Sequence, residues 1–144
     1  MSEMQTTTTP IVYAGACCYH DAIKMIGWLE RAFGFKKHAV YMADDGNSVV
    51  HAEMAYGSSI LMMSSFKKTG VLAKHVRPPS ELGANTQSVY IAVPDPDAVY
   101  RTAKAAGAEI VMELADQPYG SRDFICKDPE GYVWCFGTYA PTVK

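Results

Sequence analysis

The chain has 144 residues, 49% of them hydrophobic and 19% charged, which is enough for one buried core and excludes disorder over most of the length. Its formal net charge is -2 and it has no basic run, so nucleic acid is not an expected partner. The apolar runs are too short to cross a bilayer, so no membrane association is expected.

The first half of the chain predicts one strand, one helix and then three strands. Residues 1–10 are polar and rich in threonine, and we expect them to form a flexible tail. The apolar run 11–19 suits a buried strand, although its length alone does not separate a strand from a helix. Asp21 is a suitable helix N-cap, and Gly34 supplies the C-terminal stop. The three later strands are expected at 37–42, 48–55 and 59–65, with turns at 44–47 and at Tyr56-Gly57.

The second half predicts the same order of elements. A strand at 88–93 is followed by Asp95, which can cap a helix whose first residue is Pro96. Gly107 ends that helix. Three strands then follow at 109–113, 122–127 and 132–139, the last two joined by a turn at Asp128-Pro129-Glu130-Gly131.

This internal repeat predicts an α+β fold of two βαβββ modules, at 11–66 and 88–140. A single module leaves one face of its sheet uncovered, so two modules must pair, within one chain or between two chains. The connection at 67–87 is either a linker or a loop that covers a cleft between modules.

Two segments in the second half resemble the vicinal oxygen chelate superfamily, which includes glyoxalase I, extradiol dioxygenases and bleomycin resistance proteins. They are Tyr119-Gly120-Ser121-Arg122-Asp123-Phe124 and Asp128-Pro129-Glu130-Gly131-Tyr132-Val133-Trp134, which are similar to the final hairpin of that superfamily. The stretch Val50-His51-Ala52-Glu53-Met54 with Gly57 is similar to its PhnB-like branch. The resemblance implies a cleft that holds a small molecule, commonly at the interface of a homodimer.

The metal enzymes of this superfamily use four His, Gln or Glu ligands from the first and last strands of each module. Carried over one by one, these positions fall on residues that do not form such a set, because alanine and leucine cannot bind a metal and a single thiol is too few. We therefore expect no metal cofactor. The four positions are Ala14, Leu61, Ser88 and Cys135.

Strand alternation predicts which side chains line the cleft. If the first hairpin turn has three residues, His51 and Glu53 share one face with Leu61 and Met63, while the apolar set Val50, Ala52, Met54, Ile60 and Met62 lies beneath the helix. In the second module Trp134 and Phe136 are expected beneath the helix. The predicted cleft residues there are Arg122, Phe124, Cys126, Val133 and Cys135.

Each of these candidates has a functional and a structural interpretation. His51 and Glu53 are either an acid/base pair or a structural polar pair. Arg122 either binds a carboxylate or phosphate or forms a structural ion pair. Cys135 is either a nucleophile, if a cation lowers its pKa, or a small hydrophobic residue. The connection at 67–87 is basic and either attracts an anionic ligand or is simply solvated; its cations are Lys67, Lys68, Lys74, His75 and Arg77.

Taken together, these patterns predict a metal-free protein whose cleft binds a small aromatic or anionic molecule. The alternative is a glyoxalase-like lyase or isomerase, or a dioxygenase-type enzyme, with an altered ligand set built on Glu53 and His51. A third interpretation is a dimeric scaffold without a ligand. The adjacent Cys17 and Cys18 are poor disulfide partners for each other, so the reducing cytoplasm is the expected location.

Overall fold

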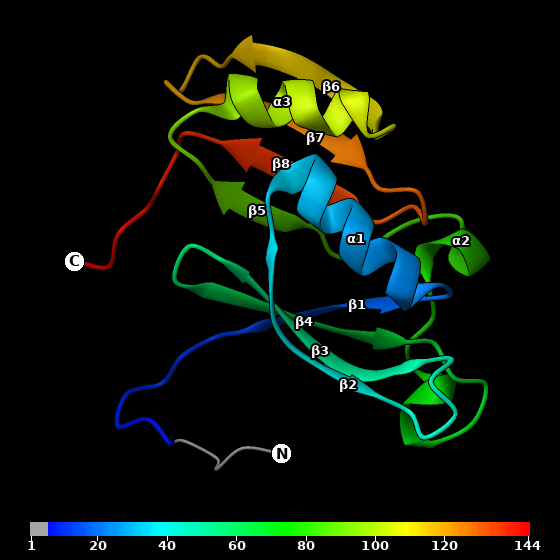
Figure 1. Ribbon diagram of the computed structural model, residues 1–144. Coiled ribbons are helices and arrows are strands. Elements are labelled where there is room, and N and C mark those ends of the chain that lie inside the picture. The colour runs from blue at the N-terminus through cyan, green and yellow to red at the C-terminus, as the bar shows by residue number, and fades with distance from the viewer. Residues whose placement is uncertain (1–5) are drawn as a thin grey trace.

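A computed structural model describes residues 6–144, apart from the side chains of residues 16 and 17 (Figure 1). The expected tail at 1–10 therefore lies partly outside the described residues, as does the side chain of Cys17. The first module contains β1 (Ala14–Tyr19), α1 (Ala22–Phe33), β2 (Lys36–Met42), β3 (Val49–Tyr56) and β4 (Ser59–Ser65). The second contains β5 (Val89–Ala92), α3 (Pro96–Ala105), β6 (Glu109–Asp116), β7 (Arg122–Lys127) and β8 (Val133–Gly137). The α+β class and the two βαβββ modules are thus confirmed.

The helices begin at the residues that the sequence predicts, because local hydrogen bonds define their ends. The carboxylate of Asp21 accepts the backbone N–H of Lys24 at 3.1 Å, and Asp95 accepts that of Ala98 at 3.2 Å. Helix α1 ends at Gly34, whose φ of 89° is readily adopted by a residue without Cβ. The cap residues therefore locate both helices before any tertiary contact is considered.

Each module forms one four-stranded sheet with a parallel pair at one side. The first sheet has the order β1-β4-β3-β2 and the second β5-β8-β7-β6. Strands β1 and β4 are parallel, as are β5 and β8, while the other pairs are antiparallel. The first and last strands of each module are consequently neighbours, and α1 or α3 connects the parallel strand to the rest.

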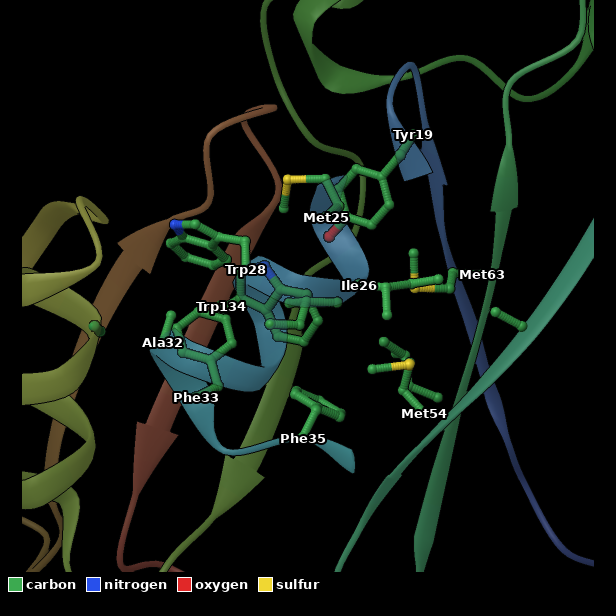
Figure 2. Close-up of a cluster of buried hydrophobic side chains, with 14 of the residues drawn as sticks. Tyr19, Met25, Ile26, Trp28, Ala32, Phe33, Phe35, Met54, Met63 and Trp134 are labelled. Carbon is green, nitrogen blue, oxygen red and sulfur yellow. The ribbon is translucent and has the colours of Figure 1, made fainter. Parts of the chain in front are cut away.

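Helix α1 lies between the two sheets and forms the centre of a single core (Figure 1). Figure 2 shows Phe33 beside Trp134, and the ring centroid of Phe33 is 5.1 Å from that of Trp134 and 4.7 Å from that of Phe136. Two hydrogen bonds join α1 to the second module, from Trp28 Nε1 to the carbonyl of Ala106 and from Thr102 Oγ1 to the carbonyl of Ala32, both at 2.7 Å. We call the face of each sheet toward this core its inner face, and the opposite face its open face.

A second junction joins the β7–β8 turn to the beginning of α1. The side chain of Glu130 accepts the backbone N–H groups of His20 and Asp21, at 2.6 and 2.9 Å. Next to it, the buried carboxylate of Asp128 accepts a hydrogen bond of 2.5 Å from the Tyr19 hydroxyl and one of 3.1 Å from Trp134 Nε1. The turn motif Asp128-Pro129-Glu130-Gly131 thus connects the two modules as well as two strands.

The register of the β3–β4 hairpin corrects one prediction. Tyr56 pairs with Ser59, so the turn has two residues rather than three, and Ala52 and Met54 pair with Met63 and Leu61. Because side chains alternate along a strand, this shift reverses the face of every β4 residue relative to β3. Leu61 and Met63, expected in the cleft, are core residues with 4% and 3% of their surface exposed.

The same shift also changes which apolar residues of β3 and β4 lie beneath the helix. Ala52 and Met54 are buried there as predicted. The prediction is wrong for Met62 and Ile60, which pair with Glu53 and Ala55 and lie on the open face. It is also wrong for Val50, which is 47% exposed beside the irregular pairing of β2 with β3.

The connection at 67–87 is more ordered than a simple linker. It contains a 3-10 helix, η1 (Val71–Lys74), and a one-turn helix, α2 (Pro79–Leu82), neither of which the sequence predicts. The amide of Asn85 donates to the carbonyl of Gly131 at 2.8 Å and accepts the N–H of Val133 at 3.3 Å, which anchors the segment to the β7–β8 hairpin. In the described part of the chain, no helix is long and apolar enough to cross a membrane.

Candidate functional site

The open faces of the two sheets carry several polar side chains that lie outside the core. On the first sheet, alternation with the buried Ala52, Met54, Leu61 and Met63 places Tyr41, His51, Glu53, Met62, Ser64 and Cys18 on the open face. On the second sheet, alternation with Phe124, Cys126, Trp134 and Phe136 places Tyr90, Asp123, Ile125, Cys135 and Gly137 there. Neither α1 nor α3 covers an open face, since α1 lies between the two sheets (Figure 1).

On the first sheet, His51 and Glu53 meet as the alternation predicts. His51 Nε2 lies 3.0 Å from Glu53 Oε2, and the two side chains are 37% and 27% exposed. His38 Nε2 lies 3.9 Å from the other oxygen of Glu53, so one carboxylate is shared by two imidazoles. The ring of Tyr41 is stacked on that of His51 with centroids 6.2 Å apart and an interplanar angle of 18°. The arrangement offers a flat aromatic surface beside a group that can accept or return a proton.

On the second sheet, a buried carboxylate is surrounded by tyrosines. Asp123 is only 4% exposed, and its Oδ2 accepts a 2.9 Å hydrogen bond from the hydroxyl of Tyr119. Its Oδ1 has no hydrogen-bond partner among the described residues. Tyr90 lies on the same face and donates its hydroxyl to the carbonyl of Tyr139 at 2.6 Å. Hydrogen bonding to Asp123 raises the pKa of Tyr119, and burial is the largest cause of the raised pKa of Tyr90.

Gly137 makes this close arrangement possible. A Cβ at this position would lie 2.7 Å from Cβ of Asp123 and 2.8 Å from the hydroxyl of Tyr90. Asp123 pairs with Gly137 across β7 and β8, so its Cβ is fixed by the ladder and cannot easily move away. The absence of a side chain at Gly137 therefore creates the space that Asp123 and Tyr90 occupy.

Cys135 lies on the open face, as predicted, in an environment that favours its structural interpretation over the nucleophile interpretation. Burial, together with the nearby Asp123 carboxylate, raises the pKa of its thiol to about 11. A nucleophilic cysteine needs a cation or a helix N-terminus that stabilises the thiolate. The structural interpretation of Cys135 as a small, weakly polar residue is the one that fits.

The raised pKa of Cys135 gives a testable pH dependence. We expect alkylation by iodoacetamide near neutral pH to be roughly 100-fold slower at Cys135 than at an unperturbed thiol, because the thiolate fraction falls tenfold for each pKa unit. The rate should keep rising with pH up to about 11, whereas the urea-unfolded chain should level off about two units lower. Peptide mass spectrometry after timed labelling measures the site-specific rate. A plateau near pH 8 in the folded protein would contradict the assignment.

The structure favours the structural interpretation of Arg122 over anion binding. Arg122 lies on the inner side of β7, where Nε and the second terminal nitrogen donate to Asp97 at 2.8 and 3.0 Å. A third nitrogen donates to Asp116 at 3.3 Å. Hydrogen bonding to Asp97 is the largest cause of the raised pKa of Arg122, so the guanidinium is committed to structural ion pairs.

Phe124 and Cys126, like Arg122, were predicted to line the cleft, but all three lie on the inner side of β7. Both are fully buried, and the ring of Phe124 stacks on Phe136 at a centroid distance of 5.4 Å. Asp123 and Ile125 take the open face instead. The sequence analysis missed Asp123. Alternation along β7 and β8, which correctly placed Cys135 on the open face, would have pointed to it.

The connecting segment borders three cavities, one of which, of about 700 Å³, lies between residues 79–88 and the β7–β8 turn. A second, of about 400 Å³, lies between η1 and the open face of the first sheet and is lined in part by Cys18, Val50 and Ser64. The segment therefore covers one end of that face, in line with the second interpretation of the connection given above. The third cavity, of about 670 Å³, lies between the start of β1, the segment that includes α2, and the starts of β5 and β8.

The residues present do not fit the metal centre of the family. Of the four expected positions, Leu61 faces the core and Ala14 has no donor atom, while the thiol of Cys135 has a raised pKa. Among the described residues, no three His, Cys, Asp or Glu side chains converge on a point where they could hold an ion.

Known proteins share both sequence and architecture with this chain. The sequence model of the Glyoxalase/Bleomycin resistance protein/Dioxygenase superfamily matches residues 16–136. An uncharacterized protein of Mycobacterium bovis is 29% identical over 117 residues, which are 81% of this chain and 76% of that relative. The crystal structure of TioX from a Micromonospora species has a TM-score of 0.70 and 27% identity, covering 90% of this chain and 99% of that one. A PhnB protein from Bacillus cereus has a TM-score of 0.61 at 15% identity, over 87% and 96% of the two chains, and so shares the fold alone.

Proposed function

The chain belongs to the glyoxalase/bleomycin resistance protein/dioxygenase superfamily, and we propose that it is a metal-free member that binds a small planar aromatic molecule on the open faces of its sheets. The observation that carries the proposal is the stacked pair of Tyr41 and His51 on the open face of the first sheet, where the half-buried Met62 also lies, paired with Glu53. Flat rings and a thioether suit an aromatic ligand, and the Glu53 carboxylate supplies a hydrogen-bond acceptor. Assignment to the PhnB-like branch remains a prediction.

An aromatic ligand is better supported here than an anionic one. The arginine expected to bind an anion is held by Asp97 and Asp116 on the inner side of the sheet. The carboxylates that do face the open sides, Glu53 and Asp123, would repel an anion placed beside them.

We further propose that two copies of the chain pair to enclose the ligand. Small-molecule sites usually bury most of the ligand, and a single flat sheet face cannot do so. Pairing the open face of the first sheet in one copy with that of the second sheet in its partner would bring the His51 and Asp123 groups to opposite walls of one cleft. Sedimentation analysis at several concentrations tests this: a monomer at micromolar concentration, with and without ligand, would exclude a dimeric site.

The binding proposal is tested with a panel of uncharged planar aromatic compounds of two or three fused rings, by thermal shift and ligand-observed NMR. A compound present at 100 times its Kd should stabilise the fold by about 2.7 kcal/mol. Tyr41→Ala and Met62→Ala should each weaken binding about tenfold, which corresponds to about 1.4 kcal/mol. Ile23→Ala, on the exposed side of α1, is the matched control and should not change affinity. No shift with any compound, or equal losses in the control, would exclude the proposal.

A second candidate function is proton transfer by the Glu53 and His51 pair, as in a lyase or isomerase. The specific observation in its favour is the 3.0 Å distance between His51 Nε2 and Glu53 Oε2 on an accessible face. Glu53→Gln preserves the shape of the side chain and removes the base. If any turnover of a bound compound is detected, this variant should abolish it while leaving binding intact; unchanged turnover would rule out the pair as the acid/base group.

A further inference from the structure

The cavity of about 670 Å³ between the two modules, here called the junction cavity, is distinct from the open-face clusters described above. Its walls come from three parts of the chain: residues 12–15 at the start of β1, residues 75–89 of the connection and β5, and residues 132–134 at the start of β8. Its lining includes none of His51, Glu53, Asp123 or Cys135. The volume is in the range of ordinary small-molecule sites.

The walls of the junction cavity leave apolar surface exposed. Tyr13, Val76 and Leu82 line it, with 45%, 41% and 56% of their surface accessible to solvent. Val89 and Val133 contribute further apolar surface from the second sheet. An apolar molecule in the cavity would remove this surface from water, which is worth about 25 cal/mol per Å².

The wall formed by the connecting segment is anchored. Pro78 and Pro79 are buried, and the side chain of Asn85 is hydrogen-bonded to both Gly131 and Val133. The rigid attachment on either side of α2 keeps the cavity open without a bound molecule, so a ligand would not have to order this wall.

The lining of the junction cavity contains basic side chains and, among the described residues, no acidic ones. Although the chain has 15 acidic and 13 basic residues, no Asp or Glu is among the described residues that line the junction cavity, whereas His75 and Arg77 are. Arg77 is half exposed, and its ion-pair partner in the described chain is Glu81, at 3.9 Å, which leaves most guanidinium donors available. Thr86 and Ser88 add hydroxyl groups to the same wall.

From the apolar walls, the anchored segment and the guanidinium of Arg77 in the lining, we propose that the junction cavity binds a flat apolar molecule carrying a carboxylate, sulfonate or phosphate, with Arg77 as the group that receives the anion. Guanidinium binds such oxyanions through paired hydrogen bonds, which a lysine ammonium cannot reproduce. The basic character of the connection, evident in the sequence, then has a specific role at Arg77. This site does not depend on the function proposed for the open faces.

The test uses two fluorescent probes of the same ring system. Anilinonaphthalene sulfonate carries the anion, and phenylnaphthylamine lacks it; both fluoresce more strongly in an apolar site. Fluorescence titrations of the wild-type protein and of Arg77→Ala should show about tenfold weaker binding of the sulfonate in the variant, with the affinity for the neutral probe unchanged. Arg77→Lys should recover only part of the loss.

Two further variants keep the test specific to this cavity. Glu81→Gln removes the residue that competes for Arg77 and should strengthen sulfonate binding. Arg101→Ala removes an exposed arginine that does not line the cavity and should have no effect. The proposal is overturned if the sulfonate does not bind the wild-type protein, if Arg77→Ala weakens both probes equally, or if Arg101→Ala matches Arg77→Ala. Circular dichroism of each variant confirms that the fold is intact.

Discussion

Replacing Asp128 with alanine is expected to lower the free energy of unfolding by about 4 kcal/mol, since it removes one acceptor that several buried donors share. Four donors converge on this one carboxylate: the Tyr19 hydroxyl, Trp134 Nε1, and the backbone N–H groups of Glu130 and Tyr132. Burial is the largest cause of the raised pKa of Asp128, and the four hydrogen bonds act in the opposite direction. The variant loses the acceptor while the donors stay buried.

Urea denaturation followed by tryptophan fluorescence measures this effect, at one protein concentration so that self-association does not alter the comparison. Asp128→Asn retains one acceptor oxygen and should cost clearly less than Asp128→Ala. Asp44→Ala, at an exposed turn, is the matched acidic control and should change stability by less than about 0.5 kcal/mol. A loss below about 1 kcal/mol for Asp128→Ala would show that the network contributes little.

Replacing Phe33 with alanine is expected to cost about 3–5 kcal/mol, the usual range for removing a buried phenylalanine ring. The ring packs against Trp28 and Phe35 in the first module and against Trp134 and Phe136 in the second. Figure 2 shows it between the α1 ribbon and the second sheet. The cavity left behind would be lined by aromatic rings from both modules, which cannot collapse without moving one module against the other.

Because the same contact holds the two sheets with their open faces outward, Phe33→Ala should also reduce binding of any open-face ligand. Ile23→Ala, on the exposed side of the same helix, should change stability by less than about 1 kcal/mol. Chemical denaturation and thermal unfolding of the ligand-free protein measure the stability of both variants. Equal stability of the two variants would mean that α1 does not join the modules as described.

Local patterns in the sequence were sufficient for the eight strands of the described residues, for α1 and α3, and for the repeat, but not for η1 and α2. Asp21 with Gly34, and Asp95 with Pro96, define the helices through hydrogen bonds and backbone conformations that involve only neighbouring residues. The motif Asp128-Pro129-Glu130-Gly131 likewise identified the β7–β8 turn, while its contact with the start of α1 involves residues more than 100 positions earlier and left no local signal.

The site was only partly predictable, because side-chain direction in a strand has a period of two. His51 with Glu53, and Cys135, were placed on the open faces correctly, since each follows from alternation within one strand. Leu61 and Met63 were misplaced by a turn one residue shorter than expected, and Phe124 and Arg122 by the wrong parity on β7. Asp123 was missed because its value as a site lies in its burial beneath Tyr119 and beside Gly137, which no sequence pattern expresses.

The sequence by itself determined the α+β class, the two βαβββ modules and the family, because caps, turns and apolar periodicity act over a few residues and occur twice in the chain. Only the tertiary structure decided which sheet faces are open, that Arg122 is committed to Asp97, and that Arg77 faces a cavity between the modules. The physical reason is that these properties depend on strand register and on the packing of α1 between two sheets, where contacts join residues far apart in the chain.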